Sequence, residues 1–343
     1  MNLDRYLPSG PLRSIVESIG ILIAAMGIGL AIVTATGGNP VETVRALVYG
    51  SVGNSVNLSS TLVKSVPLAL TGLSVALAFR AGLFNIGGEG QLYVGAAGAA
   101  WIGALDIGLP SAVHLPLTIA TGCTFGAIWG GIAGWLKASR GVHEVINTIM
   151  LNYIAIYGVD YLVRAPLSAG SHTARTADVV SSSRLPVMWE APPIEVSCGI
   201  VIAGMLCLGC WWMLFRTPIG FDIRTVGQNP EAADSVGVSS RRITVLAMTL
   251  AGAIAGAAGS LEITGVHHTL YAQFSPGYGF DGIAVALLGR SHPLAVIPAA
   301  FLFGALRTAD RWLQLSAGVP KDIVIIIQAV AILAVGLKSV KKI

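Results

Sequence analysis

Ten apolar runs that carry few charged residues follow one another along the 343-residue chain. They cover residues 18–36, 61–79, 82–105, 115–136, 145–163, 197–215, 243–262, 280–289, 293–306 and 322–337. A helix needs about 20 apolar residues to cross a bilayer, because each residue adds only about 1.5 Å of length. Runs of this kind throughout the chain predict an all-α polytopic membrane protein, a single membrane domain over residues 1–343.

The composition excludes the other broad classes. Charged residues make up 11% of the chain, against about 25% in an average soluble domain. The 54% of apolar residues exceeds what a disordered chain carries. A net charge of +4, with dispersed basic residues, argues against a nucleic-acid partner and leaves membrane lipid as the surroundings. The four cysteines lie in apolar stretches without the partners of a metal site, so we expect no metal.

The span count is open between eight and ten. Runs 280–289 and 293–306 are too short to cross alone, and only four residues separate them. They are either half-helices of a re-entrant pair or short helices packed inside a bundle.

Basic residues predict the orientation. With the N-terminus inside and ten crossings, thirteen of the 21 Lys and Arg residues fall on the inner side. This bias favours cytoplasmic termini. Residues 37–60 then lie outside and begin a short helix at Asn39 and Pro40, residues 164–196 form an external loop, and residues 216–242 form a cytoplasmic loop.

The loop 216–242 carries one short capped helix in its sequence. Asn229 is a good N-cap, Pro230 a good first residue, Glu231 suits the first turn, and Gly237 supplies the stop after Ala232 and Ala233. So short a helix is marginal in water and needs something to pack against. The loop is either an ordinary connector or a docking helix for a cytoplasmic partner.

The glycine-rich stretch 78–96 places an acid at the start of an apolar run. Acids inside a membrane span are costly, at about 2.5–3.5 kcal/mol. One interpretation is a broken helix that lines a polar pathway; the other is a helix start that the acid merely caps. The candidate pathway residues here are Phe84, Asn85, Glu89, Gln91 and Tyr93.

The second half of the chain repeats this pattern. Phe280 and Asp281 lie among Gly277, Gly279 and Gly282, and open another apolar run five spans later. An odd offset predicts halves of inverted topology. Small-residue ladders at Gly126, Gly130 and Gly134, and at Gly252 and Gly256, predict close helix packing. Asn147, Thr148 and Asn152 either cross-link helices or touch a polar solute.

Four motifs in order complete this description: LFNIGGEGQL (83–92), VHEVINTIMLNYIA (142–155), GQNPEAADSVGV (227–238) and SPGYGFDGIAVALLGR (275–290). Together they resemble the permease subunits of bacterial ABC importers for nucleosides and simple sugars, which are related to ribose and branched-chain amino-acid permeases. The resemblance covers about residues 40–337, and His143 and Gln228 depart from the usual pattern.

The resemblance implies half of a two-permease pore in the bacterial inner membrane, completed by a homologous permease. A cytoplasmic ATPase would bind the loop 216–242, where Asn229, Pro230, Glu231, Ala232, Ala233 and Gly237 match a coupling helix. An external substrate-binding lipoprotein would deliver a nucleoside. The chain has no Gly-Lys-Ser/Thr motif, so ATP would be held by the partner and the chain itself would be no enzyme. The alternatives are a simple-sugar permease of the same family and a secondary transporter without an ATPase.

Overall fold

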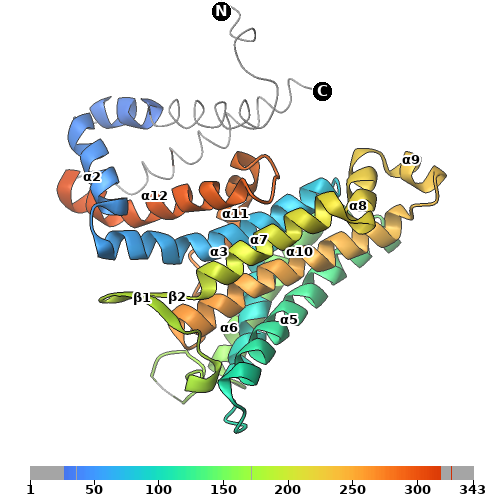
Figure 1. Ribbon diagram of the computed structural model, residues 1–343, viewed down its shortest axis with the longest axis horizontal. Helices are drawn as coiled ribbons and strands as arrows, with labels where there is room; N and C mark the ends of the chain where they lie inside the picture. The colour runs from blue at the N-terminus through green and yellow to red at the C-terminus, as the bar shows by residue number, and fades with distance from the viewer. Residues whose placement is uncertain (1–26, 36, 171, 318–325, 327–343) are drawn as a thin grey trace, which may run out of the picture.

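The computed structural model describes residues 27–35, 37–170, 172–317 and 326, and within them the protein is built almost wholly from helices (Figure 1). The helices are α2 (Pro40–Val52), α3 (Ser55–Arg80), α4 (Gly88–Gly103), α5 (Ser111–Arg140), α6 (Glu144–Arg164), α7 (Gly199–Arg216), α8 (Pro218–Gln228), α9 (Pro230–Ser235), α10 (Ser240–Glu262), α11 (Tyr278–Leu288) and α12 (Val296–Ala317). Residues 27–35 are helical, and a π-helical turn, η3 (Ile263–His267), extends α10.

Among the described residues, five helices are long and apolar enough to cross a membrane: α3, α5, α6, α7 and the continuous helix Ser240–His267. They contain the predicted runs 61–79, 115–136, 145–163, 243–262 and nearly all of 197–215, so these predictions are confirmed. Most of run 18–36 and nearly all of run 322–337 lie outside the described residues. The protein is an all-α polytopic membrane protein.

Three helices depart from simple spans. α4 has 16 residues and begins at Gly88, so run 82–105 is not one helix. α11 has 11 residues, about 17 Å, which is little more than half of a bilayer core of about 30 Å. α12 has 22 residues and extends well beyond run 293–306, but it is not among the five described helices that are long and apolar enough to cross a membrane. That run stops before Arg307, whereas the helix continues to Ala317, and Arg307 pairs with Asp281 inside the protein.

Glycines let α5 and α10 pack backbone against backbone, as the small-residue ladders predict. A Cβ added to Gly256 would lie 3.0 Å from the Gly126 Cα, and one added to Gly252 would lie 3.0 Å from the Gly130 Cα. Both distances are too short for ordinary side-chain contact. The two helices thus interlock through bare backbone, which gives the closest van der Waals contact available between helices in lipid.

The connection 164–196 is more ordered than an irregular loop. It contains a 3₁₀ turn (Ser181–Ser183) and an antiparallel hairpin of β1 (Val187–Ala191) and β2 (Ile194–Ser197). Its backbone also pairs with other segments: Thr176 N–H donates to the Leu270 carbonyl (2.8 Å) and Val179 N–H to that of His268 (2.7 Å). The alternating residues on either side of Pro192-Pro193 were the available sequence signal for the hairpin.

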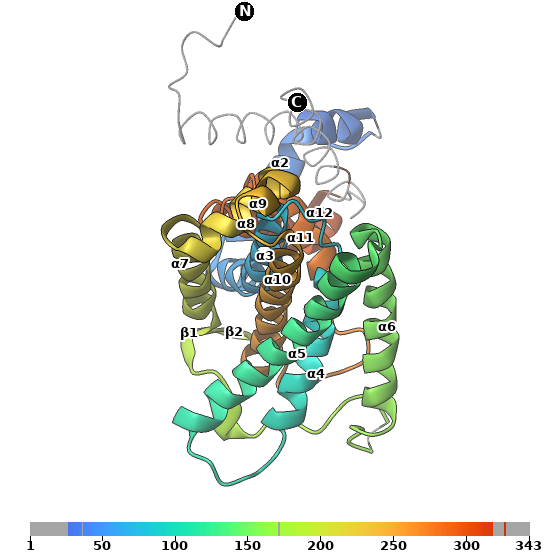
Figure 2. The same cartoon turned by 90° about the vertical axis from the view of Figure 1, so that its right-hand side faces the viewer.

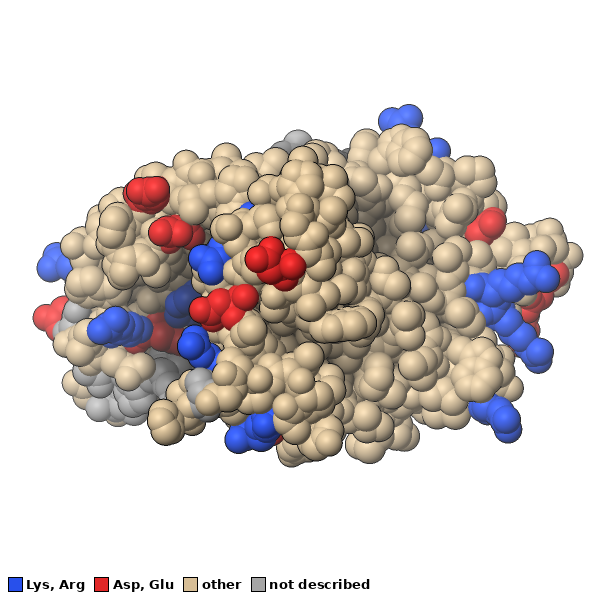
Figure 3. Space-filling model, turned by 90° about the horizontal axis from the view of Figure 1, so that it is seen from below, with Lys and Arg blue, Asp and Glu red and all other residues tan. Residues whose placement is uncertain are grey.

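Charge separates the two ends of the molecule. We call them the α9 end, where α8 and α9 lie, and the hairpin end, where β1 and β2 lie (Figure 1). Figure 3 shows Lys and Arg side chains, with a few Asp and Glu among them, at the α9 end, charges of both signs at the hairpin end, and a broad band without charge between them. Basic residues at the α9 end include Lys137, Arg140, Arg216, Arg241 and Arg242. The uncharged band is what a chain that crosses a bilayer requires.

The packing of α5 on α10 yields a first prediction. Gly256→Leu should lower the thermal midpoint and the folded yield in detergent, because the side chain has no room and overpacking costs about 1–3 kcal/mol or more. Gly209→Leu on α7 is the matched control, since nothing lies within 4 Å of a Cβ there. Equal midpoints for the two variants would contradict the interlocked packing.

Candidate functional site

α4 and α11 start at one point and run in opposite directions. α4 ends at the hairpin end, where the Gly103 carbonyl accepts from Val180 N–H (2.9 Å). α11 ends near the α9 end, where Arg80 Nε donates to the carbonyl of Ser291 (2.8 Å), just beyond the helix. The chain therefore turns back into the membrane domain before each of these helices. It does so from the α9 end before α4 and from the hairpin end before α11. This is the arrangement that inverted halves with broken helices predict. Figure 2 shows α4 beside α5 and α6 on one flank.

Glu89 joins the two helix starts. It is the second residue of α4, its side chain is buried, and its Oε2 accepts from the backbone N–H of Gly279 (2.5 Å), the second residue of α11. The first N–H groups of a helix have no partner within the helix, so a carboxyl oxygen satisfies one of them here. Only glycine fits at position 279, because a Cβ there would collide with the Glu89 backbone.

The remaining bonds hold α11 in the same place. The Ser275 hydroxyl accepts from the N–H groups of Gly277 (3.2 Å) and Tyr278 (3.3 Å). Gly277 has φ +96°, a left-handed conformation that suits glycine. Thr71, in the apolar middle of α3, donates to the Tyr278 carbonyl (3.0 Å). The start of α11 is thereby fixed at mid-span depth.

Amide side chains hold the start of α4. Asn85 and Gln91 are buried and bond to each other through two contacts of 3.1 Å. Asn152 of α6 accepts from Gly90 N–H and donates to the Ile86 carbonyl, both at 2.8 Å. Asn147 donates to the Ala133 carbonyl (3.0 Å), so the two asparagines of α6 cross-link helices.

Asp281 lies one turn into α11 and forms an ion pair that the sequence analysis missed. Arg307 Nε of α12 lies 2.6 Å from Asp281 Oδ2, and the same guanidinium donates to the Pro276 carbonyl (3.0 Å). Lys64 of α3 donates to the Arg307 carbonyl (3.1 Å). Arg307 directly follows the apolar run 293–306 in the sequence.

A second buried acid was also missed. Glu262 at the end of α10 is buried and lies 3.2 Å from His267 Nε2. The signal was available, since Glu262 is an acid within a predicted apolar run. The His267 ring contacts Tyr271, with centroids 5.1 Å apart.

The aromatic residues predicted for the pathway fall into two groups. Tyr93 is buried and packs on Phe274, with ring centroids 4.9 Å apart. Phe84 and Phe280 are half exposed, at 49% and 44%. The predicted residues near the junction are therefore mostly a bonded internal framework, and these two rings face outward from it.

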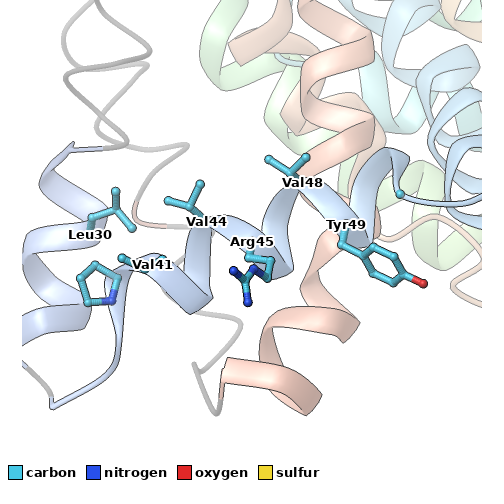
Figure 4. Close-up of a pocket in the computed structure, with 8 residues that line it drawn as sticks. Leu30, Val41, Val44, Arg45, Val48 and Tyr49 are labelled. Atoms are coloured by element: carbon cyan, nitrogen blue, oxygen red, sulfur yellow. The ribbon is translucent and has the colours of Figure 1, made fainter.

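Two cavities have different characters. One of about 830 Å³ lies between α3, α12 and the hairpin, and its wall carries Lys64, Arg307 and Arg311. The other, about 650 Å³, is an apolar groove on α2 lined by Leu30, Val41, Val44, Val48 and others (Figure 4). Among the described residues that line this groove, Arg45 is the one charged residue, so the groove offers little to a polar solute.

The loop 216–242 holds two helices rather than the single one expected. α8 begins at Pro218, with Thr217 Oγ1 accepting from Gly220 N–H (3.2 Å). α9 matches the prediction: Asn229 Oδ1 accepts from Ala232 N–H (3.0 Å), Pro230 is its first residue, and Glu231 lies in its first turn. Thr217 and Pro218 were the available sequence signal for the start of α8.

The two faces of α9 differ. Ala233 is fully buried in this chain's own core, whereas Glu231, Ala232 and Val236 are exposed, Val236 by 74%. Asp234 accepts from both the N–H (2.9 Å) and the hydroxyl (2.8 Å) of Ser240, and these bonds hold the pKa of Asp234 below its usual value. Gly237 follows with φ +89°. The helix is thus anchored on one side and presents the other to solvent.

Comparison with known proteins identifies the class. Residues 57–336 match the family described as the branched-chain amino acid transport system / permease component, and the chain belongs to this family. It is 37% identical to the guanosine ABC transporter permease protein NupP of Bacillus subtilis, over 92% of this chain and 90% of the relative. It is 35% identical to the glucose ABC transporter permease protein TsgB13 of Haloferax volcanii (91% and 84%). It is 32% identical to the nucleoside ABC transporter permease protein NupB of Lactococcus lactis (96% and 92%).

Proposed function

We propose that this chain, as one permease domain over residues 1–343, forms half of the pore of an ATP-driven importer for nucleosides. The observation that carries the proposal is α9, a capped helix anchored by Ala233 with its other face exposed, in a member of a permease family. An exposed helix of six residues is marginal alone, so a partner that packs on it is expected. That partner is the cytoplasmic ATPase, which holds the ATP.

A second, homologous permease completes the pore. Bacillus subtilis has two guanosine ABC transporter permease proteins similar to this chain, NupP at 37% and NupQ at 25% identity. An external binding lipoprotein delivers the solute. Lys and Arg at the α9 end support a cytoplasmic position for that end. The distribution of basic residues along the sequence further supports cytoplasmic termini in a bacterial inner membrane.

The solute route passes the junction of α4 and α11. Phe84, Phe280 and Asp281 face the route, and the buried Asn85, Glu89, Gln91 and Tyr93 hold its wall in shape. Half-exposed aromatic rings suit a flat base better than they suit a sugar. Glucose is the second candidate, because one relative is a glucose permease protein.

Uptake by the reconstituted complex tests the substrate. We expect ATP-dependent uptake of labelled guanosine only when both permeases, the ATPase and the binding protein are present, with competition by nucleosides and none by glucose or pentoses. Competition by sugars alone would contradict the nucleoside assignment. Uptake by this chain without the ATPase would instead indicate a secondary transporter.

Coupling is tested on the exposed face of α9. Glu231→Arg combined with Ala232→Trp should lower uptake about tenfold or more, because both side chains would disturb a packed interface. The protein level in the membrane should stay normal, since neither residue is buried. Ser139→Trp, at an exposed site near the end of α5, is the control. Unchanged uptake in the double variant would make α9 an ordinary connector.

A further inference from the structure

The exposed face of α6 carries three tyrosines in a row. Tyr153, Tyr157 and Tyr161 are spaced by four residues, so they lie along one side of the helix. They are 51%, 66% and 65% exposed, and the rings of Tyr153 and Tyr157 are stacked with centroids 6.4 Å apart. We call this set the tyrosine face. Tyr153 lies within the motif 142–155, whereas Tyr157 and Tyr161 lie outside the four motifs, and none of the three is among the candidate pathway residues.

The depth of the tyrosine face follows from its neighbour Asn152. Asn152 bonds to Gly90 and Ile86 at the start of α4, so Tyr153 lies at the level where α4 and α11 meet. Along α6, Tyr153 is about 14 Å from Glu144 and about 17 Å from Arg164. It therefore lies near the middle of the span, and Tyr157 and Tyr161 continue from there to the hairpin end.

A tyrosine at this depth does not suit lipid. Hydrocarbon offers no hydrogen-bond partner to a hydroxyl, and tyrosines that face lipid gather at the membrane surfaces. Within the described part of the chain no hydrogen bond engages the hydroxyl of Tyr153 or Tyr157. The exposed side of α7 has no tyrosine: Val201, Met205 and Leu208 lie there, with Trp212 near the helix end, whereas on α6 the tyrosines lie among the exposed Ile146, Met150 and Ile154.

We propose that the tyrosine face lines the water-filled nucleoside route in the half of the membrane next to the hairpin end. The rings offer flat faces on which a base stacks, and the hydroxyls donate to and accept from ribose and base. Asp160 and Arg164, paired at 2.8 Å, stand at the outer end of the row. The identity of the solute as a nucleoside rests on the proposed function, whereas the water-filled route along the tyrosine face does not.

Thiol labelling tests directly whether the tyrosine face contacts water. Tyr153→Cys and Tyr157→Cys are made in a chain whose four cysteines are replaced by alanine and which still imports. The assembled complex is treated with a charged, membrane-impermeant methanethiosulfonate. A thiol reacts as thiolate, which forms in water and not in lipid, so both variants should react about tenfold faster or more than Leu208→Cys. Leu208 is the matched control, 54% exposed at mid-span on α7. Reaction no faster than the control overturns the inference.

The solute is tested separately. Saturating guanosine with its binding protein should slow the labelling of Tyr157→Cys, and Tyr157→Leu should lower uptake more than Tyr157→Phe, which keeps the ring. If labelling is fast but only a pentose protects, the water route stands and the nucleoside assignment fails. If guanosine is imported normally but neither cysteine reacts, the nucleoside assignment stands and the tyrosine face is not in the route.

Discussion

One hydrogen bond in the middle of the membrane domain connects its two halves. Glu89 at the start of α4 accepts from Gly279 at the start of α11, and both residues are buried, so the protein itself satisfies this helix terminus. Two re-entrant segments and two broken helices meet at this bond, and the contact demands glycine at position 279. A buried polar group without a hydrogen-bond partner costs about 1–3 kcal/mol, so this bond stabilises the contact between the two halves.

The surrounding residues divide into a rigid part and an open part. The rigid part comprises the glycine ladders of α5 and α10, the Asn85–Gln91 pair and the bonds of Asn152 to α4. The open part comprises half-exposed aromatic rings and the exposed side of α9. The packed helices form the framework of the membrane domain, and the exposed side chains are available for contact with other molecules.

The features predicted well from sequence are those that neighbouring residues determine. Apolar runs located five spans, Asn229-Pro230 located the start of α9, and glycine spacing predicted close helix packing at α5 and at α10. The features missed depend on residues far apart in the chain. Arg307 directly follows an apolar run, yet it lies inside α12 and pairs with Asp281, 26 residues away. Likewise, Glu89 could be identified as an unusual acid, but its partner in Gly279 lies 190 residues on.

Hydrogen exchange at the Gly279 amide, followed in peptides spanning residues 275–282, tests most directly whether Glu89 joins the two halves. In the native protein that amide is bonded to a buried carboxyl group, so its exchange should be slow. Glu89→Ala should make it fast, whereas Phe84→Ala, which changes a half-exposed ring nearby, should leave it slow. Equal protection in the native protein and in Glu89→Ala would show that Glu89 does not join the two halves, and would contradict the account.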